Sequence, residues 1–239
     1  DTYYLILEKS HSLRAQQEKL LLGHSERVEW LDSLPRSFSG VMLANEVLDA
    51  FGFDRFLMEA GGWSMMMVSL DDHQFVWTTA PARQDALPFL PPEVPEGFVY
   101  DLSVEALSFL SECSVALKSG YMLVVDYGYP RGVILSSYPR GTLTCYYRHT
   151  VSDDPFERIG DQDITFFLDW DIFRAVAAQS GFREELFVSQ TEFLMSGGIH
   201  QVLSEMETAH SPIEIVKARL AAKNLLLSFK NYRVALWTK

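Results

Sequence analysis

Three apolar runs of the sequence, each with the composition of a buried strand, end in a carboxylate. The carboxylates are Glu8, Glu46 with its neighbour Asn45, and Asp126. A carboxylate is costly to bury unless it is paired or has a function. Ligands of open parallel α/β sheets bind at the carboxyl ends of strands. We therefore expect these side chains to meet in one cleft.

Glu8 follows the first apolar run. A carboxylate in this position would accept hydrogen bonds from the hydroxyl groups of a ribose, as in nucleotide-binding α/β folds. The alternative is a solvated loop carboxylate or an ion pair with Lys9.

The stretch VMLANEVLDA places Asn45, Glu46 and Asp49 directly after the second apolar run. Carboxylates bind a guanidinium group bidentately, so these residues would hold a cationic substrate or a cofactor. The same spacing also suits a helix start, with Asn45 as the N-cap and both acids favoured by the helix dipole. Spacing alone does not choose between the two interpretations.

Asp126, Tyr127 and Gly128 follow the third run, where the glycine permits a tight turn or a close backbone approach. The alternative is an ordinary turn, in which Asp and Gly are common.

Residues 129–165 show little periodicity, and a loop of this length is usually functional or mobile. His149 lies in this loop near Tyr146 and Tyr147, while Asp163 and Thr165 stand among aromatic residues and would line a substrate channel. The alternatives are a surface histidine and capping of a helix near Trp170. For Gln190, too, the alternative is that it only caps the next helix.

The elements that must position these residues alternate between strand and helix, which predicts an open, mostly parallel α/β sheet with right-handed crossovers. A short antiparallel meander interrupts it. The expected strands are 3–8, 27–30, 41–44, 121–125, 185–188 and 233–237; the meander is 53–59, 63–69 and 74–79; helices lie after 10, near 106–117, and at 170–180, 191–206 and 212–228.

Composition excludes several classes of protein. The net charge is −12 and Lys and Arg are dispersed, so no groove for nucleic acid is expected. The two cysteines form no CxxC motif, which argues against a disulfide framework and a zinc site. No apolar run approaches membrane-spanning length and no signal peptide is visible. Because the sequence opens on a strand, we expect it to be an N-terminally truncated piece of a longer protein.

Six segments occur in an order that resembles the MidA-type family of S-adenosylmethionine-dependent methyltransferases: YYLILEKSHSLRAQQEKLL, ANEVLDAF, LVVDYG, RGTLTCYYRHTVSDDPFERIGDQDIT, QTEFLMSGGI and SFKNYRVALW. Mitochondrial members of that family are associated with assembly of respiratory complex I and methylate an arginine of one of its subunits. The resemblance implies a class I (Rossmann-like) methyltransferase sheet of seven strands, one of them antiparallel. It covers 1–239 as a single domain with insertions at 53–96 and 129–167.

The resemblance also implies roles for individual residues. Cofactor-binding residues are expected to be Glu8, Ser10, Trp30, Leu31, Asn45 and Glu46. The catalytic residues are expected to be Glu46, Asp49 and Asn45: Asn45 and Glu46 would face the transferred methyl group, and Glu46 with Asp49 would orient a guanidinium. Substrate-binding residues are expected to be Asp126, Tyr127, His149, Asp163, Thr165 and Gln190.

This sequence departs from the family at three places. The family's first strand and glycine-rich loop would precede residue 1. The family usually has a proline soon after the segment that corresponds to LDAF, whereas this sequence has Gly52 there. Phe167 stands where the family usually has a histidine.

The resemblance implies methylation of a protein arginine, in the cytoplasm of a bacterium or the mitochondrial matrix of a eukaryote. The alternatives are a non-catalytic assembly factor that keeps the fold and a small-molecule methyltransferase.

Overall fold

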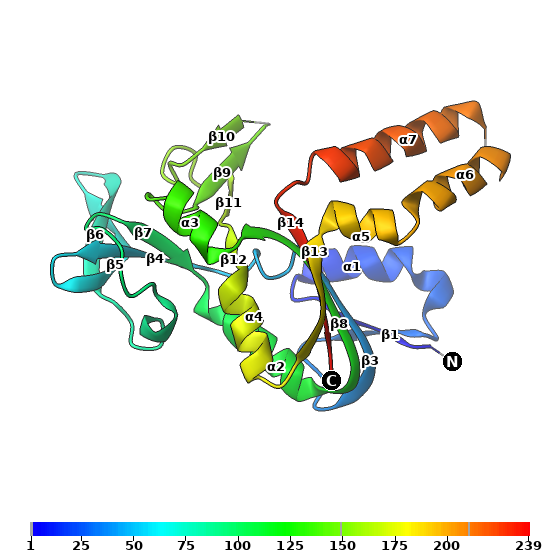
Figure 1. Cartoon of the computed structure of the whole chain (residues 1–239), viewed down its shortest axis with the longest axis horizontal. Helices are drawn as coiled ribbons and strands as arrows, with labels where there is room; N and C mark the ends of the chain where they lie inside the picture. Colours follow the sequence, from blue (N-terminus) through cyan, green and yellow to red (C-terminus); the bar gives the residue numbers. More distant parts are fainter. Residues whose placement is uncertain (1, 149, 210) are drawn as a thin grey trace.

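The computed structural model describes residues 2–148, 150–209 and 211–239, and their side chains except those of 207–209. A five-stranded sheet lies at its centre (Figure 1). Its members are β3 (Phe38–Asn45), β8 (Leu117–Tyr129), β12 (Leu168–Asp169), β13 (Arg183–Ser189) and β14 (Tyr232–Thr238).

The register of this sheet decides which residues meet where the strands β3 and β8 end. β3 runs parallel to β8 and places Asn45 opposite Val125. β14 runs antiparallel to β8 and places Tyr232 opposite Tyr127. The end of β3, the end of β8 and the start of β14 therefore lie side by side.

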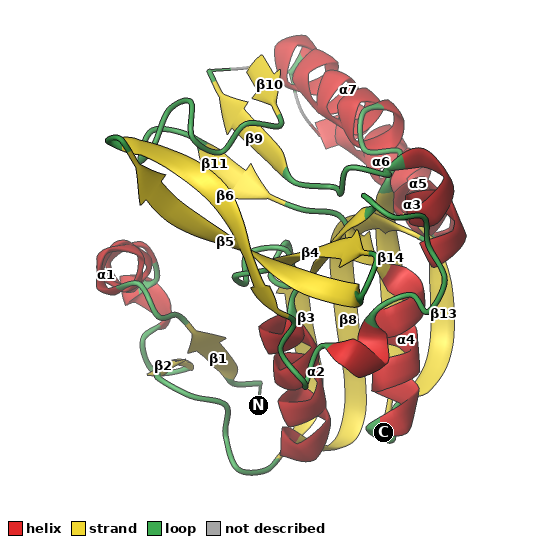
Figure 2. Ribbon diagram, turned by 90° about the vertical axis from the view of Figure 1, so that its left-hand side faces the viewer, coloured by secondary structure: helices red, strands yellow, loops and turns green. Residues whose placement is uncertain are grey.

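A separate parallel pair carries the first carboxylate. It consists of β1 (Tyr4–Leu7) and β2 (Val28–Leu31), joined through α1 (His11–Leu20) and the 3-10 turn η1 (Leu22–His24). Leu7 lies opposite Leu31, so both strands end at the same level. Figure 2 shows this pair beside β3, and no strand pairing joins the two sheets within the described residues.

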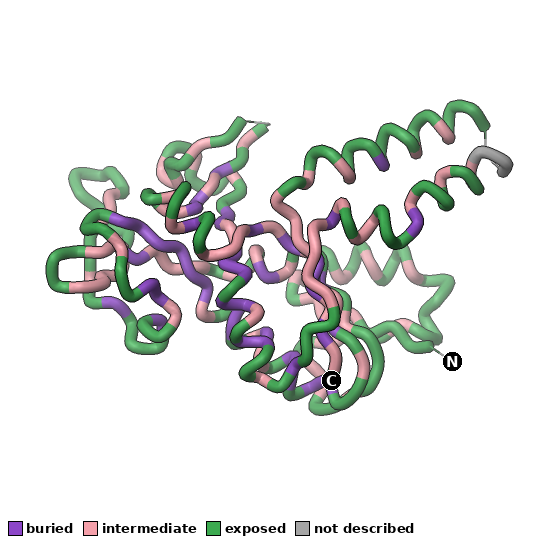
Figure 3. Tube along the Cα trace, viewed as in Figure 1, coloured by how far each residue is buried: buried purple, intermediate pink, exposed green. Residues whose placement is uncertain are grey.

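The core lies against one face of the central sheet. Helices α2 (Val104–Ala116) and α4 (Trp170–Gln179) pack there (Figure 3). The alternation of strands explains the pattern: Met122 and Val124 are buried, whereas Val41, Leu43 and Tyr121 remain exposed.

The predicted antiparallel meander is confirmed. Its strands are β4 (Asp54–Glu59), β5 (Gly62–Asp71) and β6 (Gln74–Pro81). A fourth strand, β7 (Val99–Leu102), pairs with β4 after the short η2 turn (Leu87–Phe89). A side-chain contact also joins β4 to β7: the Asp101 carboxylate on β7 accepts a hydrogen bond from Arg55 Nε on β4 at 2.8 Å.

The prediction of a long loop at 129–165 is wrong. The segment forms α3 (Arg131–Ser137) and a small antiparallel sheet of β9 (Thr144–Tyr147), β10 (Thr150–Ser152) and β11 (Asp163–Thr165). Its ordering depends on distant groups, because buried Asp101 accepts hydrogen bonds from the Thr142 and Leu143 N–H groups at 2.5 and 2.8 Å. Sequence periodicity does not report such contacts.

Three helices extend from the sheet: α5 (Gln190–Ser196), α6 (Ile199–Ala209) and α7 (Pro212–Leu227). The predicted helix at 191–206 is divided at Gly197 and Gly198, the second of which has φ +84°. Capping boxes at Ser189 and Ser211 start α5 and α7. In Figure 1 the α6–α7 pair projects away from the body of the molecule.

No described helix is both long enough and apolar enough to cross a membrane.

Candidate active site

The segment after β3 is a turn held by a buried carboxylate. Asp126 is fully buried, and its Oδ2 accepts from Leu48 N at 3.0 Å and Asp49 N at 3.3 Å. Its Oδ1 accepts from Tyr127 N at 2.9 Å. No helix begins at Asn45, so the capping interpretation of this segment is wrong. The backbone N–H groups after β3 are bound by the end of β8 instead.

Burial has a clear effect on this carboxylate. Desolvation, followed by the nearby charge of Asp49, raises the pKa of Asp126 to about 7, although backbone N–H groups oppose the change. Asp126 thus lies beneath the protein surface, hydrogen-bonded to the backbone of the turn. Its oxygens bind the protein backbone, whereas the resemblance implies that it binds substrate.

Tyr127 connects the turn to the 129–167 insertion. Its hydroxyl donates to Asp49 Oδ2 and also lies in hydrogen-bond contact with Thr165 Oγ1. Asp49 Oδ1 is buried and has no hydrogen-bond partner among the described residues. A buried carboxylate oxygen without a donor is unusual and calls for an explanation.

Glu46 lies at the exposed side of the same turn. It has a left-handed backbone (φ 49°), which is unusual for a residue other than glycine, and its N–H donates to Val125 O at 2.9 Å. Its carboxylate lies beside the Tyr232 hydroxyl. Burial, and then the charge and hydrogen bonding of Glu46, raise the pKa of Tyr232. The phenol therefore stays protonated.

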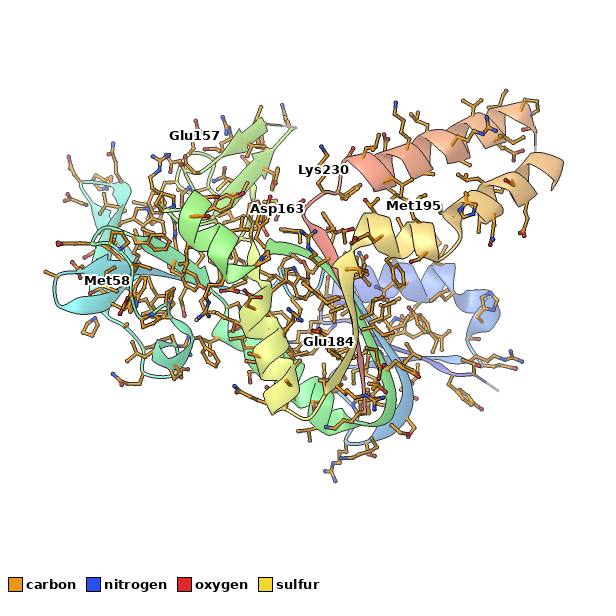
Figure 4. All side chains as sticks on the ribbon, in the orientation of Figure 1. Met58, Glu157, Asp163, Glu184, Met195 and Lys230 are labelled. Carbon is orange, nitrogen blue, oxygen red and sulfur yellow. The ribbon has the colours of Figure 1, made fainter. Side chains whose placement is uncertain are left out.

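Aromatic rings border the two carboxylates. The Tyr127 and Tyr232 ring centroids lie 5.3 Å apart, and the Phe167 ring packs against the edge of Tyr127 at 6.1 Å. The site therefore combines negative charge with aromatic walls, which suits a cation. Figure 4 shows the side chains of this region, with Asp163 on β11 and Lys230 before β14 labelled.

Glu8 belongs to a second cluster, on the β1–β2 pair. Its Oε1 accepts from Ser10 N at 2.8 Å and its Oε2 from Gln17 Nε2 at 3.1 Å. Gln17 in turn accepts from Trp30 Nε1 at 3.0 Å. A carboxylate offers about four acceptor positions, so Glu8 keeps room for hydroxyl donors. Ser10 caps α1, and Leu31 ends β2 beside Trp30.

The remaining predicted residues lie in different places. Thr165 reaches Tyr127, whereas Asp163 is exposed on β11 with no described contact to the turn. Gln190 Nε2 donates to Leu225 O at 3.4 Å and so joins α5 to α7. His149 lies outside the described residues. No group of His, Cys, Asp and Glu within the described residues could hold a metal ion.

Sequence reasoning missed the contacts of Tyr232 and Gln17, and it noted Phe167 only as the residue at the family's usual histidine position. One signal could have found Tyr232. The resemblance implies one antiparallel strand, and the start of such a strand lies beside the end of its parallel-running neighbour.

The strand order and the strand-end acids define an α/β protein of the class I methyltransferase type. Residues 1–188 match a family described as "Putative S-adenosyl-L-methionine-dependent methyltransferase", and the chain belongs to this family.

Two crystal structures of proteins from Burkholderia thailandensis, both of one superfamily, are similar to it. The first is an uncharacterized protein with 30% sequence identity to this chain and a TM-score of 0.90. The match covers 99% of this chain and 66% of the other protein's chain. The second, bound to S-adenosyl-homocysteine, has 31% sequence identity to this chain and a TM-score of 0.88. The match covers 99% of this chain and 64% of the other protein's chain.

The predicted class I fold is thereby confirmed. The chain spans about two thirds of the length of these two proteins. No curated protein matches it.

Proposed function

We propose that this protein is an S-adenosylmethionine-dependent methyltransferase that acts on an arginine side chain of a protein substrate. Family membership and the relative that binds S-adenosyl-homocysteine support the reaction type. The observation that carries the substrate class is the turn after β3. It presents Glu46 and Asp49 together, with Asp49 Oδ1 buried and unpartnered among the described residues.

The residues present fit the cofactor's polar groups. Glu8 has free acceptor capacity for ribose hydroxyls, and Trp30 and Leu31 lie beside it at the end of β2. Asn45 and Glu46 are exposed at the end of β3 and would face the methionine portion. When bound, the cofactor supplies an electrophilic methyl group.

The chain's own residues would then orient the nucleophile. Glu46 and Asp49 would bind a guanidinium group and limit its motion, which is the main requirement of an in-line displacement. As the new N–C bond forms, the nitrogen must lose a proton. The exposed Glu46 carboxylate of the same turn would take it.

The biological setting extends the proposal. In line with the MidA-type resemblance, we place the substrate among proteins of respiratory-complex assembly. The compartment would be the cytoplasm of a bacterium or the mitochondrial matrix of a eukaryote.

The test uses the intact protein and two measurements. Calorimetry with S-adenosyl-homocysteine measures cofactor binding, for which Glu8→Gln should weaken affinity about tenfold. Transfer of labelled methyl from S-adenosylmethionine to arginine peptides, with matched lysine peptides as the control, measures the substrate class. A Glu46→Gln variant that methylates arginine at the wild-type rate would refute the assigned role. Absence of cofactor binding would favour the non-catalytic assembly factor.

A further inference from the structure

Two tyrosines that no sequence pattern singles out as a pair face the two carboxylates of the turn. We infer that Tyr127 and Tyr232 are positioning residues that hold Asp49 and Glu46 ready for a cationic substrate group. This inference rests on the proposed function, and it concerns how that site keeps its charge available.

The first argument is register. Tyr127 and Tyr232 are direct partners across the β8–β14 pair, and directly opposite residues share one face of a sheet. Their rings lie 5.3 Å apart. Each phenol faces a different acid: Tyr127 donates to Asp49 Oδ2, and Tyr232 lies beside the Glu46 carboxylate.

The second argument assigns the phenol proton. Tyr127 has one O–H, and it is donated to Asp49. Thr165 must then donate its own hydroxyl proton to the Tyr127 oxygen. A directed chain runs from Thr165 through Tyr127 to Asp49. It fixes the orientation of the Asp49 side chain.

The third argument concerns charge. A Lys or Arg partner would hold these acids equally well but would cancel their charge. No ion pair with Lys or Arg involves Glu46 or Asp49 among the residues that the structure describes. A neutral phenol donor orients a carboxylate while leaving its negative charge for an incoming cation. The second Asp49 oxygen is buried and has no hydrogen-bond partner among the described residues.

The experiment measures binding of N-acetyl-L-arginine amide to the intact protein loaded with S-adenosyl-homocysteine. The neutral citrulline analogue is the control ligand. Tyr127→Phe and Tyr232→Phe should each weaken arginine-amide binding about tenfold while leaving S-adenosyl-homocysteine affinity unchanged. The matched control variant is Tyr121→Phe, which makes the same change at an exposed position of the same strand.

A double-mutant comparison separates positioning from general packing. If Tyr127 acts through Asp49, adding Tyr127→Phe to Asp49→Asn should cause little further loss of binding. A full additional tenfold loss would overturn the inference. Thr165→Val gives a second approach should Tyr127→Phe unfold, and about threefold weaker binding is expected from it. Unchanged binding in Thr165→Val would count against the chain of hydroxyl groups.

Failure of the inference and failure of the proposed function give different results. If Asp49→Asn and Glu46→Gln leave arginine-amide binding unchanged, the cationic substrate class is wrong. If those variants lose binding while both tyrosine variants keep wild-type affinity, the tyrosines have no positioning role and the proposed function stands.

Discussion

Asp126 gives the sharpest prediction about stability. It is a buried carboxylate that accepts three backbone hydrogen bonds, yet burial raises its pKa from the ordinary value of 3.8 to about 7. The folded protein therefore binds more protons than the unfolded chain between about pH 4 and pH 7. The contribution of this group to stability is fully present below pH 4 and is lost as the pH rises through 7.

The magnitude follows from the pKa change. One pKa unit corresponds to about 1.4 kcal/mol, so a rise from 3.8 to about 7 amounts to about 4 kcal/mol. Asp126→Asn removes the titration. Its amide oxygen replaces one acceptor, but its NH₂ group must face a backbone donor. That unmade hydrogen bond costs about 1–3 kcal/mol, independent of pH.

The assay is urea unfolding of wild type and Asp126→Asn at a series of pH values from 4.5 to 8. We expect the wild type to be the more stable protein at low pH. Its advantage should shrink by about 1.4 kcal/mol per pH unit up to pH 7. In an Asp49→Asn background the decline should end at lower pH, because the neighbouring charge is gone. Parallel curves, or an advantage that grows with pH, would refute the reasoning.

Three further predictions concern the backbone and the buried ion pair. Gly120→Ala should cost several kcal/mol in urea unfolding, because its Cβ would lie 1.9 Å from a β3 carbonyl oxygen and its φ is +125°. Arg55→Met should cost about 3–5 kcal/mol, since it leaves the Asp101 carboxylate, whose side chain is 0% exposed, without its cation. Glu46→Gly should match Asp72→Gly in stability within about 1 kcal/mol, because both relieve a left-handed backbone. Only Glu46→Gly should lose methyl transfer, and equal activity of the two variants would contradict the role of Glu46.

The parts of the fold that local pattern determines could be predicted. Strands β3 and β8 appear in the sequence as apolar runs, although both are longer than expected. The meander appears as short alternating strands separated by Gly61-Gly62 and Asp71-Asp72. In both cases the signal lies within the segment itself.

The parts that distant contacts determine could not be predicted. The turn at 46–50 has a sequence suited to a helix start, but Asp126, far along the chain, binds its N–H groups. The 129–167 insertion gains its order from Asp101 in the same way. The role of Tyr232 depends on antiparallel pairing with β8, which no local pattern reports.

The strand-end carboxylates look alike in sequence, yet the donors that reach them divide them into two kinds. The oxygens of Asp126 are occupied by backbone N–H groups, which are fixed and cannot make way for a ligand. Glu46 and Asp49 meet phenol groups, and one oxygen of Asp49 meets no donor among the described residues. A carboxylate whose acceptors are filled supports the fold, whereas under the proposed function the carboxylates with unfilled acceptors bind substrate. The first kind holds the second in place, because the N–H groups bound by Asp126 belong to the turn that carries Asp49.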